Sequence, residues 1–367
     1  MRIAIVNDLA LAREVLRRLV RSVPDYVVAW TAENGEEAVR KAAQDRPDMI
    51  LMDLVMPVLD GVEATRRIMA QRPCPILLVT STVTGNFNMV YRAMGYGGLD
   101  AVNTPTLAAD GTVKDGEGIL ARIAKLARQQ KAQAGTLSGG ASACLSRPCL
   151  PERNTPTGAT AGLPMLLALG ASTGGPQALA HILQALPADF PAGVVIIQHI
   201  AAEFAPGLAL WLHGYSALPI RLAGNGDKLK AGEVLLAGTD DHLSLGADHR
   251  LVYTAHPQDY PYRPSVDVFF HSLAASWPRP GVAVLLTGMG SDGAHGMLQL
   301  RQLGWHTIAQ DQASCVVYGM PKAAADLRAA CAVLPLTQIP AAIVDYIRQF
   351  RFESAVSQKP SSRGNQR

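Results

Sequence analysis

One serine of this sequence stands in a setting that is typical of nucleophiles. Residues 170–174 read Gly-Ala-Ser-Thr-Gly; they follow the apolar run MLLALG and precede a helix-like segment. In a G-x-S-x-G turn between a strand and a helix, the glycines permit the sharp turn and the serine hydroxyl stands at the carboxyl edge of the sheet. The pattern is short, so Ser172 alone also fits a structural turn or a phosphate-binding loop.

A serine nucleophile needs a base, and the base needs an acid that orients it. His199 ends the apolar run VVIIQH, and Asp292 lies in LLTGMGSDG, after another apolar run. The three side chains would leave strands at one sheet edge, which predicts Ser172 as nucleophile, His199 as base and Asp292 as orienting acid. His295 is the rival base, although it should begin a helix. Four other histidines are expected to be exposed: His213, His242, His249 and His256.

The glycine-rich turns around this set offer backbone N–H groups that could hold an oxyanion. The candidates for such an oxyanion or substrate loop are Thr173, Gly174 and Met289.

A second set of polar residues follows strands in the first part of the chain. Asp8 follows the first strand, Asp53 the third and Thr80 the fourth. Two carboxylates that converge on one pocket repel each other, and an oxygen-binding divalent cation would relieve this repulsion. Magnesium beside a nucleophilic carboxylate is the chemistry of an aspartyl phosphate. The alternative is that these acids only cap the helices after them.

The elements that position both sets alternate along the chain. Five strand-like runs, RIAIV, YVVAWT, MILMD, PILLVTS and DAVN, are separated by helical patterns and predict a doubly wound parallel sheet of five βα repeats. A stretch rich in Gly, Ser, Thr, Ala and Pro then predicts a flexible linker. A second α/β region follows, with strands at MLLALG, VVIIQH, EVLLAG, VAVLLTG and HTIAQ. The predicted division is 1–131, linker 132–163, second domain 164–352 and flexible tail 353–367.

Composition limits the classes of function. The 367 residues are 49% hydrophobic and 17% charged with a net charge of +3, which suits two globular domains. Basic residues form no stripe with interleaved aromatics, so nucleic acid is not expected as a partner. No apolar run approaches the roughly 20 residues of a membrane span, and Asn7 and Asp8 interrupt the N-terminal apolar run, so no signal peptide or membrane insertion is expected. Five cysteines without zinc-type spacing favour a reduced, cytoplasmic location.

The segments IVND, LMDLVMPVLDGVEA and LLVTS, with the turn at Pro105, resemble the receiver domain of response regulators over residues 1–130. The resemblance implies that Asp53 accepts a phosphoryl group from a cognate histidine kinase, that Thr80 is the switch hydroxyl, and that Mg²⁺ is held by Asp8, Asp53 and the Val55 carbonyl. Two residues depart from the family. Asn7 replaces an acid and would reach the metal through water, and Thr104 replaces the usual lysine, so the switch is expected to be weaker or coupled differently.

The second region resembles the catalytic domain of chemotaxis protein-glutamate methylesterases, the CheB family. The resemblance lies in LGASTGGPQAL, IIQH, VLLAGTDDHLSL, YRPSVDVFFHSLA, VLLTGMGSDGAHGM and AQDQASCVVYGMP. It implies the roles given above for Ser172, His199 and Asp292. The implied reaction is hydrolysis of glutamyl γ-methyl esters on cytoplasmic helices of methyl-accepting chemotaxis receptors, releasing methanol without a cofactor, together with deamidation of glutamines.

The family resemblance also implies that the unphosphorylated receiver packs over the esterase site and that phosphorylation releases it. One segment departs from the family: after His199 the chain reads IAAEFAPG in place of Met-Pro-Pro and Phe-Thr. Together with Thr104 this suggests a specialised member that serves a parallel, chemotaxis-like pathway, such as a surface-sensing system of the Wsp type.

Two other classes of function are alternatives for this sequence. In a non-catalytic, receptor-binding regulatory module Ser172 would be only a turn residue, and GASTGGP would be a phosphate loop; the segment lacks the Lys-Ser/Thr of a P-loop. A DNA-binding response regulator would need a compact helical reader and a basic face, and the sequence has neither.

Overall fold

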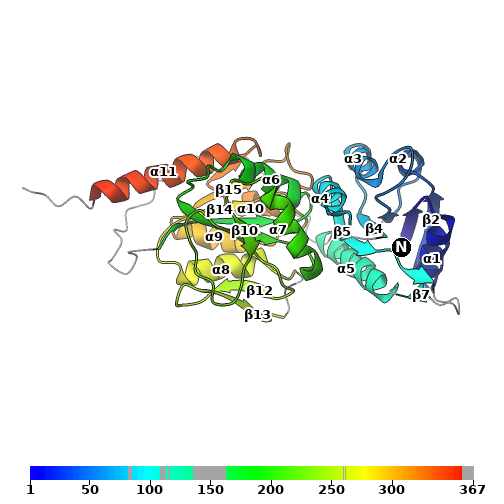
Figure 1. The fold of residues 1–367 in the computed structure, drawn as a ribbon, viewed down its shortest axis with the longest axis horizontal. Coiled ribbons are helices and arrows are strands. Elements are labelled where there is room, and N and C mark those ends of the chain that lie inside the picture. Colours follow the sequence, from blue (N-terminus) through cyan, green and yellow to red (C-terminus); the bar gives the residue numbers. More distant parts are fainter. Residues whose placement is uncertain are drawn as a thin grey trace, which may run out of the picture.

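The computed structural model describes residues 1–81, 85–107, 113–114, 116–134, 163–258, 260 and 262–357. They form two α/β lobes (Figure 1), here called the N-terminal domain, from β1 to α5, and the C-terminal domain, from β8 to α11. Helix α5 includes residues 132–134, which the sequence predicts as the start of the linker. Helix α11 includes residues 353–357, which the sequence predicts as the start of the tail. The rest of the predicted linker, 135–162, and of the predicted tail, 358–367, lies outside the described residues.

The N-terminal domain is a doubly wound parallel sheet, as the alternating pattern predicts. Its strand order is β2-β1-β3-β4-β5, and all neighbouring strands are parallel. The strands are β1 (Arg2–Val6), β2 (Val27–Ala32), β3 (Met49–Met52), β4 (Ile76–Thr80) and β5 (Gly98–Asn103). A short antiparallel pair that the sequence analysis did not predict, β6 (Thr106–Leu107) and β7 (Val113–Lys114), precedes the last helix.

Helices cover both faces of this sheet, so the central strands are buried on both sides and their sequences are continuous apolar runs. The helices are α1 (Ala10–Arg21), α2 (Gly35–Gln44), α3 (Gly61–Gln71), α4 (Phe87–Gly95) and α5 (Gly116–Ala134). Side chains cap two of them: Asn34 accepts from the Glu37 amide at the start of α2, and Asp60 accepts from the Glu63 amide at the start of α3.

The C-terminal domain is built on a seven-stranded parallel sheet of order β10-β11-β9-β8-β14-β15-β16. Its strands are β8 (Met165–Ala171), β9 (Ala192–Gln198), β10 (Ile220–Leu222), β11 (Val234–Leu236), β14 (Val282–Leu285), β15 (His306–Gln310) and β16 (Ala332–Leu334). The sequence predicts the five inner strands. It misses the edge strands β10 and β16, which have only three residues each and are partly exposed. It also misses the antiparallel hairpin of β12 (His242–Leu245) and β13 (Leu251–Thr254).

Helices also cover both faces of the second sheet. One face packs on α6 (Gly175–Ala185), α7 (Ala205–His213) and α11 (Ile339–Ser357), and the short 3-10 helix η2 (Ala202–Phe204) precedes α7. The other face packs on α8 (Val266–Ser276), α9 (Ala294–Gln302) and α10 (Met320–Asp326).

Both sheets reverse their direction of winding at one point, and the polar residues singled out above lie there. In the N-terminal sheet the order reverses between β1 and β3, which are followed by Asp8 and Asp53. In the C-terminal sheet it reverses between β8 and β14, which are followed by Ser172 and by the loop that carries Asp292. Ligands of doubly wound sheets bind at such switch points because the loops diverge there and leave a crevice.

The two domains meet through α4, which lies against α6 and α7 (Figure 1). The Tyr91 hydroxyl of α4 is buried in this contact and donates to the Phe204 carbonyl at 2.8 Å. The backbones approach closely because of a glycine: a Cβ on Gly95 would lie 2.7 Å from the Gln177 Cβ. Apolar residues of α4, α6 and α7 belong to one buried cluster that runs through both domains. The contact between the two domains therefore consists of buried apolar side chains, as in the core of a single domain.

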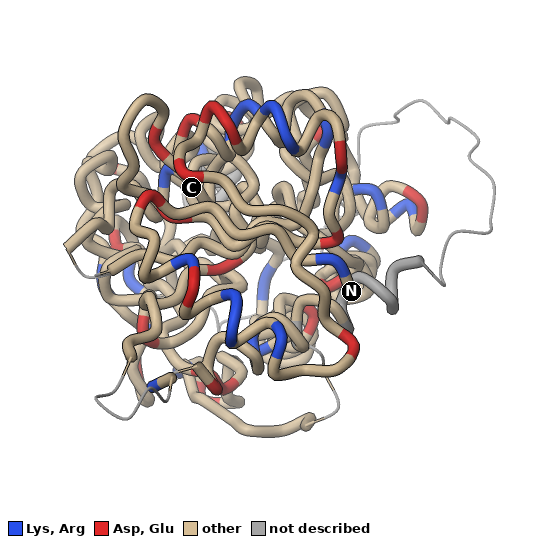
Figure 2. The backbone as a smooth tube through the Cα atoms, turned by 90° about the vertical axis from the view of Figure 1, so that its right-hand side faces the viewer, with Lys and Arg blue, Asp and Glu red and all other residues tan. Residues whose placement is uncertain are grey.

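On the face of the described residues that Figure 2 turns to the viewer, charges of the two signs are interspersed. In Figure 2, Lys and Arg alternate with Asp and Glu along the tube on the face turned to the viewer. At the domain contact, Arg122 pairs with Asp100 at 2.5 Å and with Glu203 of the C-terminal domain. Within the part of the chain that the structure describes, no helix has both the length and the apolar character that crossing a bilayer requires.

Candidate active site

Ser172 lies in the turn from β8 to α6, as the sequence predicts. The turn is tight because Gly174 adopts a left-handed conformation, with φ +80°, and a Cβ there would lie 2.7 Å from the Val316 Cβ. The Gly175 amide donates to the Ser172 carbonyl at 2.8 Å and closes the turn. Ser172 is only 9% exposed. The nucleophile candidate is thus held at the N-terminal end of a helix and is largely covered.

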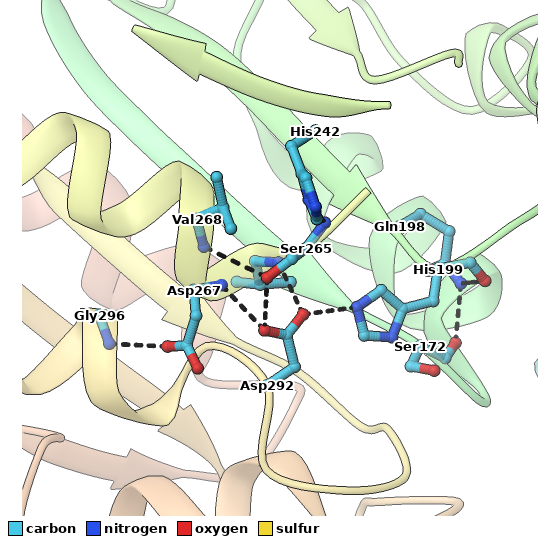
Figure 3. Close-up of polar contacts among 10 residues, drawn as sticks. Ser172, Gln198, His199, His242, Ser265, Asp267, Val268, Asp292 and Gly296 are labelled. Atoms are coloured by element: carbon cyan, nitrogen blue, oxygen red, sulfur yellow. Dashed lines mark hydrogen bonds and ion pairs between the residues drawn. The ribbon is translucent and has the colours of Figure 1, made fainter. Parts of the chain in front are cut away.

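Two buried side chains hold this turn from opposite sides. Gln198, the last residue of β9, donates from Nε2 to the Ser172 carbonyl at 2.9 Å (Figure 3). Thr287, in the loop after β14, donates from Oγ1 to the Thr173 carbonyl at 2.9 Å, and its own carbonyl accepts from the Ser172 amide at 3.1 Å. The backbone around Ser172 is therefore fixed by the two neighbouring strands rather than by the turn alone.

His199 and Asp292 are brought together as the sequence predicts, although 93 residues separate them. His199 Nε2 lies 2.7 Å from Asp292 Oδ2 (Figure 3). Asp292 is buried and accepts two backbone amides and the Ser265 hydroxyl besides His199. Burial opposes ionisation of Asp292, but the hydrogen bonds and the charge of His199 and the other donors outweigh it, so its pKa lies below the usual range. Asp292 is thus a carboxylate, and Nε2 of His199 donates to it.

This assignment leaves the other ring nitrogen of His199 as the basic one. Nδ1 is buried and has no hydrogen-bond partner. It lies on the side of the ring that faces Ser172 (Figure 3). A buried acceptor without a partner costs about 1–3 kcal/mol in a folded protein, so such an atom points to a function. The His199 ring also stacks on the Tyr262 ring, with centroids 4.3 Å apart and planes inclined by 5°.

Two expectations about the remaining histidines, those for His242 and His249, are wrong. His242 was expected to be exposed, but it is 0% exposed, because it begins strand β12 beneath the start of α8. His213 and His256 are exposed as predicted, and His249 is half-buried. His295, the rival base, lies in the first turn of α9 and is exposed, so it does not compete with His199 for the buried carboxylate.

The backbone amides that could hold an oxyanion differ in their present partners. The Ser172 amide is used within the fold, by the Thr287 carbonyl. The Gly174 amide donates to the carbonyl of Met94, the penultimate residue of α4 in the N-terminal domain, at 3.2 Å. The Thr173 and Met289 amides donate no hydrogen bond to any atom of the described ranges. Of the predicted set, these two are available.

In the N-terminal domain Asp8 lies close enough to Asp53 for its charge to act on that carboxyl, as the sequence predicts. Asp53 is 8% exposed, and its Oδ1 accepts from the Leu54 amide at 2.7 Å. Burial, countered in part by the amides of Leu54 and Val55 and reinforced by the charge of Asp8, raises the pKa of Asp53 to about 6. Oxygen donors with this unrelieved charge fit a magnesium ion, which prefers carboxylate and carbonyl oxygens.

Three other predicted residues of this set have defined contacts. Asn7 donates from Nδ2 to Asp53 Oδ2 at 2.8 Å, so it touches the phosphoacceptor candidate directly. Thr80 is buried, and its hydroxyl accepts from Asn86 Nδ2 at 3.3 Å, directly before α4. Thr104 is half-buried, and its amide donates to the Thr80 carbonyl at 2.9 Å.

Four residues of the C-terminal site were not predicted. Ser265 could have been found, because a serine before the helical run VDVFFHSLA is an N-cap signal. Gln198 and Thr287 lie beside predicted residues, but nothing in their spacing shows that their side chains turn towards the turn at Ser172. Tyr262 comes from a loop far along the chain, and no pattern in the sequence places it on His199.

Known proteins are similar to this chain over both of its domains. Residues 167–343 match the family model of the CheB methylesterase, and residues 3–110 match that of the response regulator receiver domain. The chain is 52% identical over 340 residues to protein-glutamate methylesterase/protein-glutamine glutaminase 3 of Burkholderia orbicola, covering 92% of this chain and 96% of that one. It is 52% identical over 344 residues to the protein numbered 2 of the same name in Cupriavidus metallidurans, covering 94% and 98%. The crystal structure of the Thermotoga maritima CheB methylesterase catalytic domain aligns with TM-score 0.48 and 35% identity, covering 50% of this chain and 98% of that chain.

The raised pKa of Asp53 generates a prediction about stability. In the unfolded chain Asp53 ionises near 3.8, and in the folded chain only near 6. The folded state therefore loses stability from this group as the pH rises from about 4 to about 6. Asp53→Asn lacks this loss, so its free energy of unfolding should exceed that of the wild type by roughly 1–3 kcal/mol at pH 7 without magnesium, and the gap should close towards pH 4.

Denaturant unfolding at a series of pH values measures this difference. Asp60→Asn is the matched control, because Asp60 is an exposed acid in the same loop region. A gap between wild type and Asp53→Asn that does not change with pH would contradict the prediction.

Proposed function

Because this chain belongs to the CheB family of methylesterases that carry an N-terminal receiver domain, we propose that it hydrolyses glutamate γ-methyl esters on the cytoplasmic helices of chemoreceptors and deamidates glutamines there. The observation that carries the proposal is the buried His199–Asp292 pair beside Ser172, with the unpartnered Nδ1 of His199 turned to the serine. The substrate helices lie in the cytoplasm, so the enzyme acts there.

In the proposed mechanism His199 Nδ1 takes the proton of the Ser172 hydroxyl while Oγ attacks the ester carbonyl. The resulting imidazolium keeps Nε2 bonded to Asp292, whose charge stabilises it. His199 then returns the proton to the leaving oxygen, and methanol departs from an acyl-enzyme. Water attacks this acyl group with His199 as base again, which frees glutamate and Ser172. A glutamine follows the same steps, with ammonia as the leaving group.

The oxyanion formed in each attack needs donors that the fold does not already use. We assign this role to the amides of Thr173, in the turn of Ser172, and of Met289, in the loop after β14, because neither donates a hydrogen bond within the described ranges. That loop comes close because it carries Gly288, where a Cβ would lie 2.8 Å from the Ser172 Cβ. One oxyanion donor contributes about 10²–10³-fold to rate, and general base catalysis about 10²–10⁴-fold.

The N-terminal domain supplies the regulation in this proposal. Asp53 accepts a phosphoryl group from a histidine kinase. Asp8, Asp53 and the Val55 carbonyl would hold Mg²⁺, which when bound neutralises charge on the phosphoryl oxygens, and Asn7 would reach it through water. Thr80 and Thr104 carry the change onward. The hydroxyl of Thr80 meets Asn86 at the start of α4, so a rearrangement at Asp53 has a direct route to the domain contact.

The arrangement of the domains supports inhibition by covering. Helix α4 lies on α6, the helix that begins at the Ser172 turn, and the Met94 carbonyl holds the Gly174 amide. A receptor helix cannot reach Ser172 while α4 stays in place. Phosphorylation of Asp53 would shift the equilibrium towards a separated state that admits the receptor. The altered segment after His199 and Thr104 are consistent with service in a parallel, Wsp-type pathway.

The nucleophile assignment is tested by Ser172→Ala. Methanol release from a methylated receptor cytoplasmic fragment should fall about 10³-fold or more, because the attacking oxygen is gone. Wild-type release should depend on a small-molecule phosphodonor with Mg²⁺. Ser276→Ala, at the far end of α8, is the control and should keep full activity. If Ser172→Ala retained more than a few per cent of the wild-type activity, Ser172 would not be the nucleophile. If the wild type itself released no methanol, a receptor-binding role without catalysis would be favoured instead.

The covering role of α4 is tested by Tyr91→Phe. This change removes the buried hydrogen bond to the Phe204 carbonyl and leaves the ring in place. Loss of one such bond should raise methanol release by the unphosphorylated chain about 3–10-fold, while the rate with phosphodonor should match that of the wild type.

Tyr253→Phe is the matched control for this substitution. It removes a hydroxyl that accepts the Gly238 amide at 2.8 Å, away from the domain contact. Equal unphosphorylated rates for Tyr91→Phe and the wild type would show that the contact does not limit access.

A further inference from the structure

The carboxylate of Asp292 is held by four donors, and one of them is a side chain to which no role has been given. Oδ2 accepts from His199 Nε2 at 2.7 Å and from the Val266 amide at 2.7 Å. Oδ1 accepts from the Asp267 amide at 3.0 Å and from Ser265 Oγ at 2.8 Å. Both amides belong to the first turn of α8, whose N-terminus favours a negative charge (Figure 3). Ser265 is the only side chain that contacts Oδ1 among the described residues.

The direction of the Ser265 hydrogen bond is fixed by its neighbours. Ser265 is fully buried and is the N-cap of α8, where its Oγ accepts from the Val268 amide at 3.2 Å. A hydroxyl has one proton, and the ionised Asp292 can only accept. The Ser265 proton therefore points at Asp292 Oδ1. Charge-assisted hydrogen bonds of this kind are about twice as strong as neutral ones.

The backbone of Ser265 is fixed in turn by His242. The Ser265 amide donates to His242 Nδ1 at 3.2 Å, so this nitrogen carries no proton. The other nitrogen, Nε2, lies 3.0 Å from the Pro257 carbonyl, which can only accept, so Nε2 carries the proton. His242 is thus a neutral ring in a single tautomer, and burial lowers its pKa and keeps it so. It anchors the residue that contacts Asp292.

An ordinary helix cap would not require a hydroxyl here. Serine, threonine, aspartate and asparagine all cap helices. An aspartate would place a second negative charge against Asp292 and could not donate to it. The neighbouring acid Asp267 turns away instead, and its Oδ1 accepts from the Gly296 amide at 2.7 Å (Figure 3). The Ser265 hydroxyl accepts from the Val268 amide and donates to Asp292 Oδ1 through a single atom, whereas an asparagine would need its oxygen for one bond and its nitrogen for the other.

We propose that Ser265 is a positioning residue for the reaction: its hydroxyl fixes the rotation of the Asp292 carboxylate that presents Oδ2 to His199, and His242 holds Ser265 in place. The proposal rests on the proposed function, because it acts through the base that Asp292 orients. Without the hydroxyl the carboxylate keeps its amide partners but loses one of the two contacts on Oδ1. It can then rotate about its bond to Cβ, and His199 is aligned for a smaller fraction of the time.

The test compares Ser265→Ala with Ser265→Thr in the full chain, activated by a small-molecule phosphodonor with Mg²⁺, on a methylated receptor cytoplasmic fragment. Ser265→Ala should lower kcat about tenfold and leave KM within about twofold, because loss of alignment acts on the chemical step. Ser265→Thr keeps the hydroxyl and should keep more than about half of kcat. Each rate is normalised to the folded fraction from circular dichroism.

Loss of the helix cap is controlled separately. Asn34→Ala removes the side-chain cap of α2, which lies in the N-terminal domain, whereas Ser265 and Asp292 lie in the C-terminal domain. It should lower the melting temperature, as the loss of a helix cap does, yet leave kcat unchanged. A normalised kcat of Ser265→Ala within about twofold of the wild type would overturn the proposal, and so would an equal loss of kcat in Asn34→Ala.

A double-mutant cycle shows whether Ser265 acts through Asp292. In an Asp292→Asn background, Ser265→Ala should cost less than about twofold, because the carboxylate that it orients is gone. An undiminished tenfold loss in that background would overturn the proposal. If the kcat of Asp292→Asn is as low as that of Ser172→Ala, the cycle cannot be measured. The comparison of kcat between Ser265→Ala and Ser265→Thr then tests the proposal by itself. Failure of the proposed function is distinct, since the wild type and Ser172→Ala would then release methanol alike.

Discussion

The C-terminal site depends on one buried negative charge. Asp292 sits in the interior of the domain, where a carboxylate is unstable unless its oxygens are satisfied. The fold satisfies them by placing the first turn of α8, a serine hydroxyl and an imidazole around it. These donors come from segments far apart in the sequence, so the charge also ties β9, the loop after β14 and the start of α8 to one another. The bond from His199 Nε2 to Asp292 fixes the orientation of the His199 ring beside Ser172.

The N-terminal domain faces a related constraint but meets it differently. Asp53 is also buried, yet it has fewer donors and lies near Asp8, so its charge is disfavoured rather than stabilised. The surroundings of Asp292 therefore lower its pKa and favour its charged form, whereas those of Asp53 raise its pKa and favour its neutral form. The two sites lie on separate sheets, and α4 is the element that stands between them.

How much of this the sequence predicts depends on the range of the interactions. The five βα repeats and the inner strands of the second sheet were predicted, because continuous apolar runs and short connections are local signals. Ser172, His199 and Asp292 were predicted because parallel strands bring their carboxyl ends to one edge. The edge strands β10 and β16 were missed because three half-exposed residues carry no pattern. His242 was misplaced, and Tyr262 was missed, because only the tertiary packing of loops brings them to α8 and to His199.

The contact between the Met94 carbonyl and the Gly174 amide joins main chain to main chain. Both atoms belong to the main chain, so no substitution at Met94 or Gly174 removes the donor or the acceptor, except that proline at 174 would lack the N–H. The contact does depend on Gly95 and Gly207, which let the two backbones approach each other. An added Cβ at either position would collide with the opposite domain. Side chains around the contact can therefore be exchanged without loss of this bond, whereas a side chain at Gly95 or Gly207 would push the two domains apart.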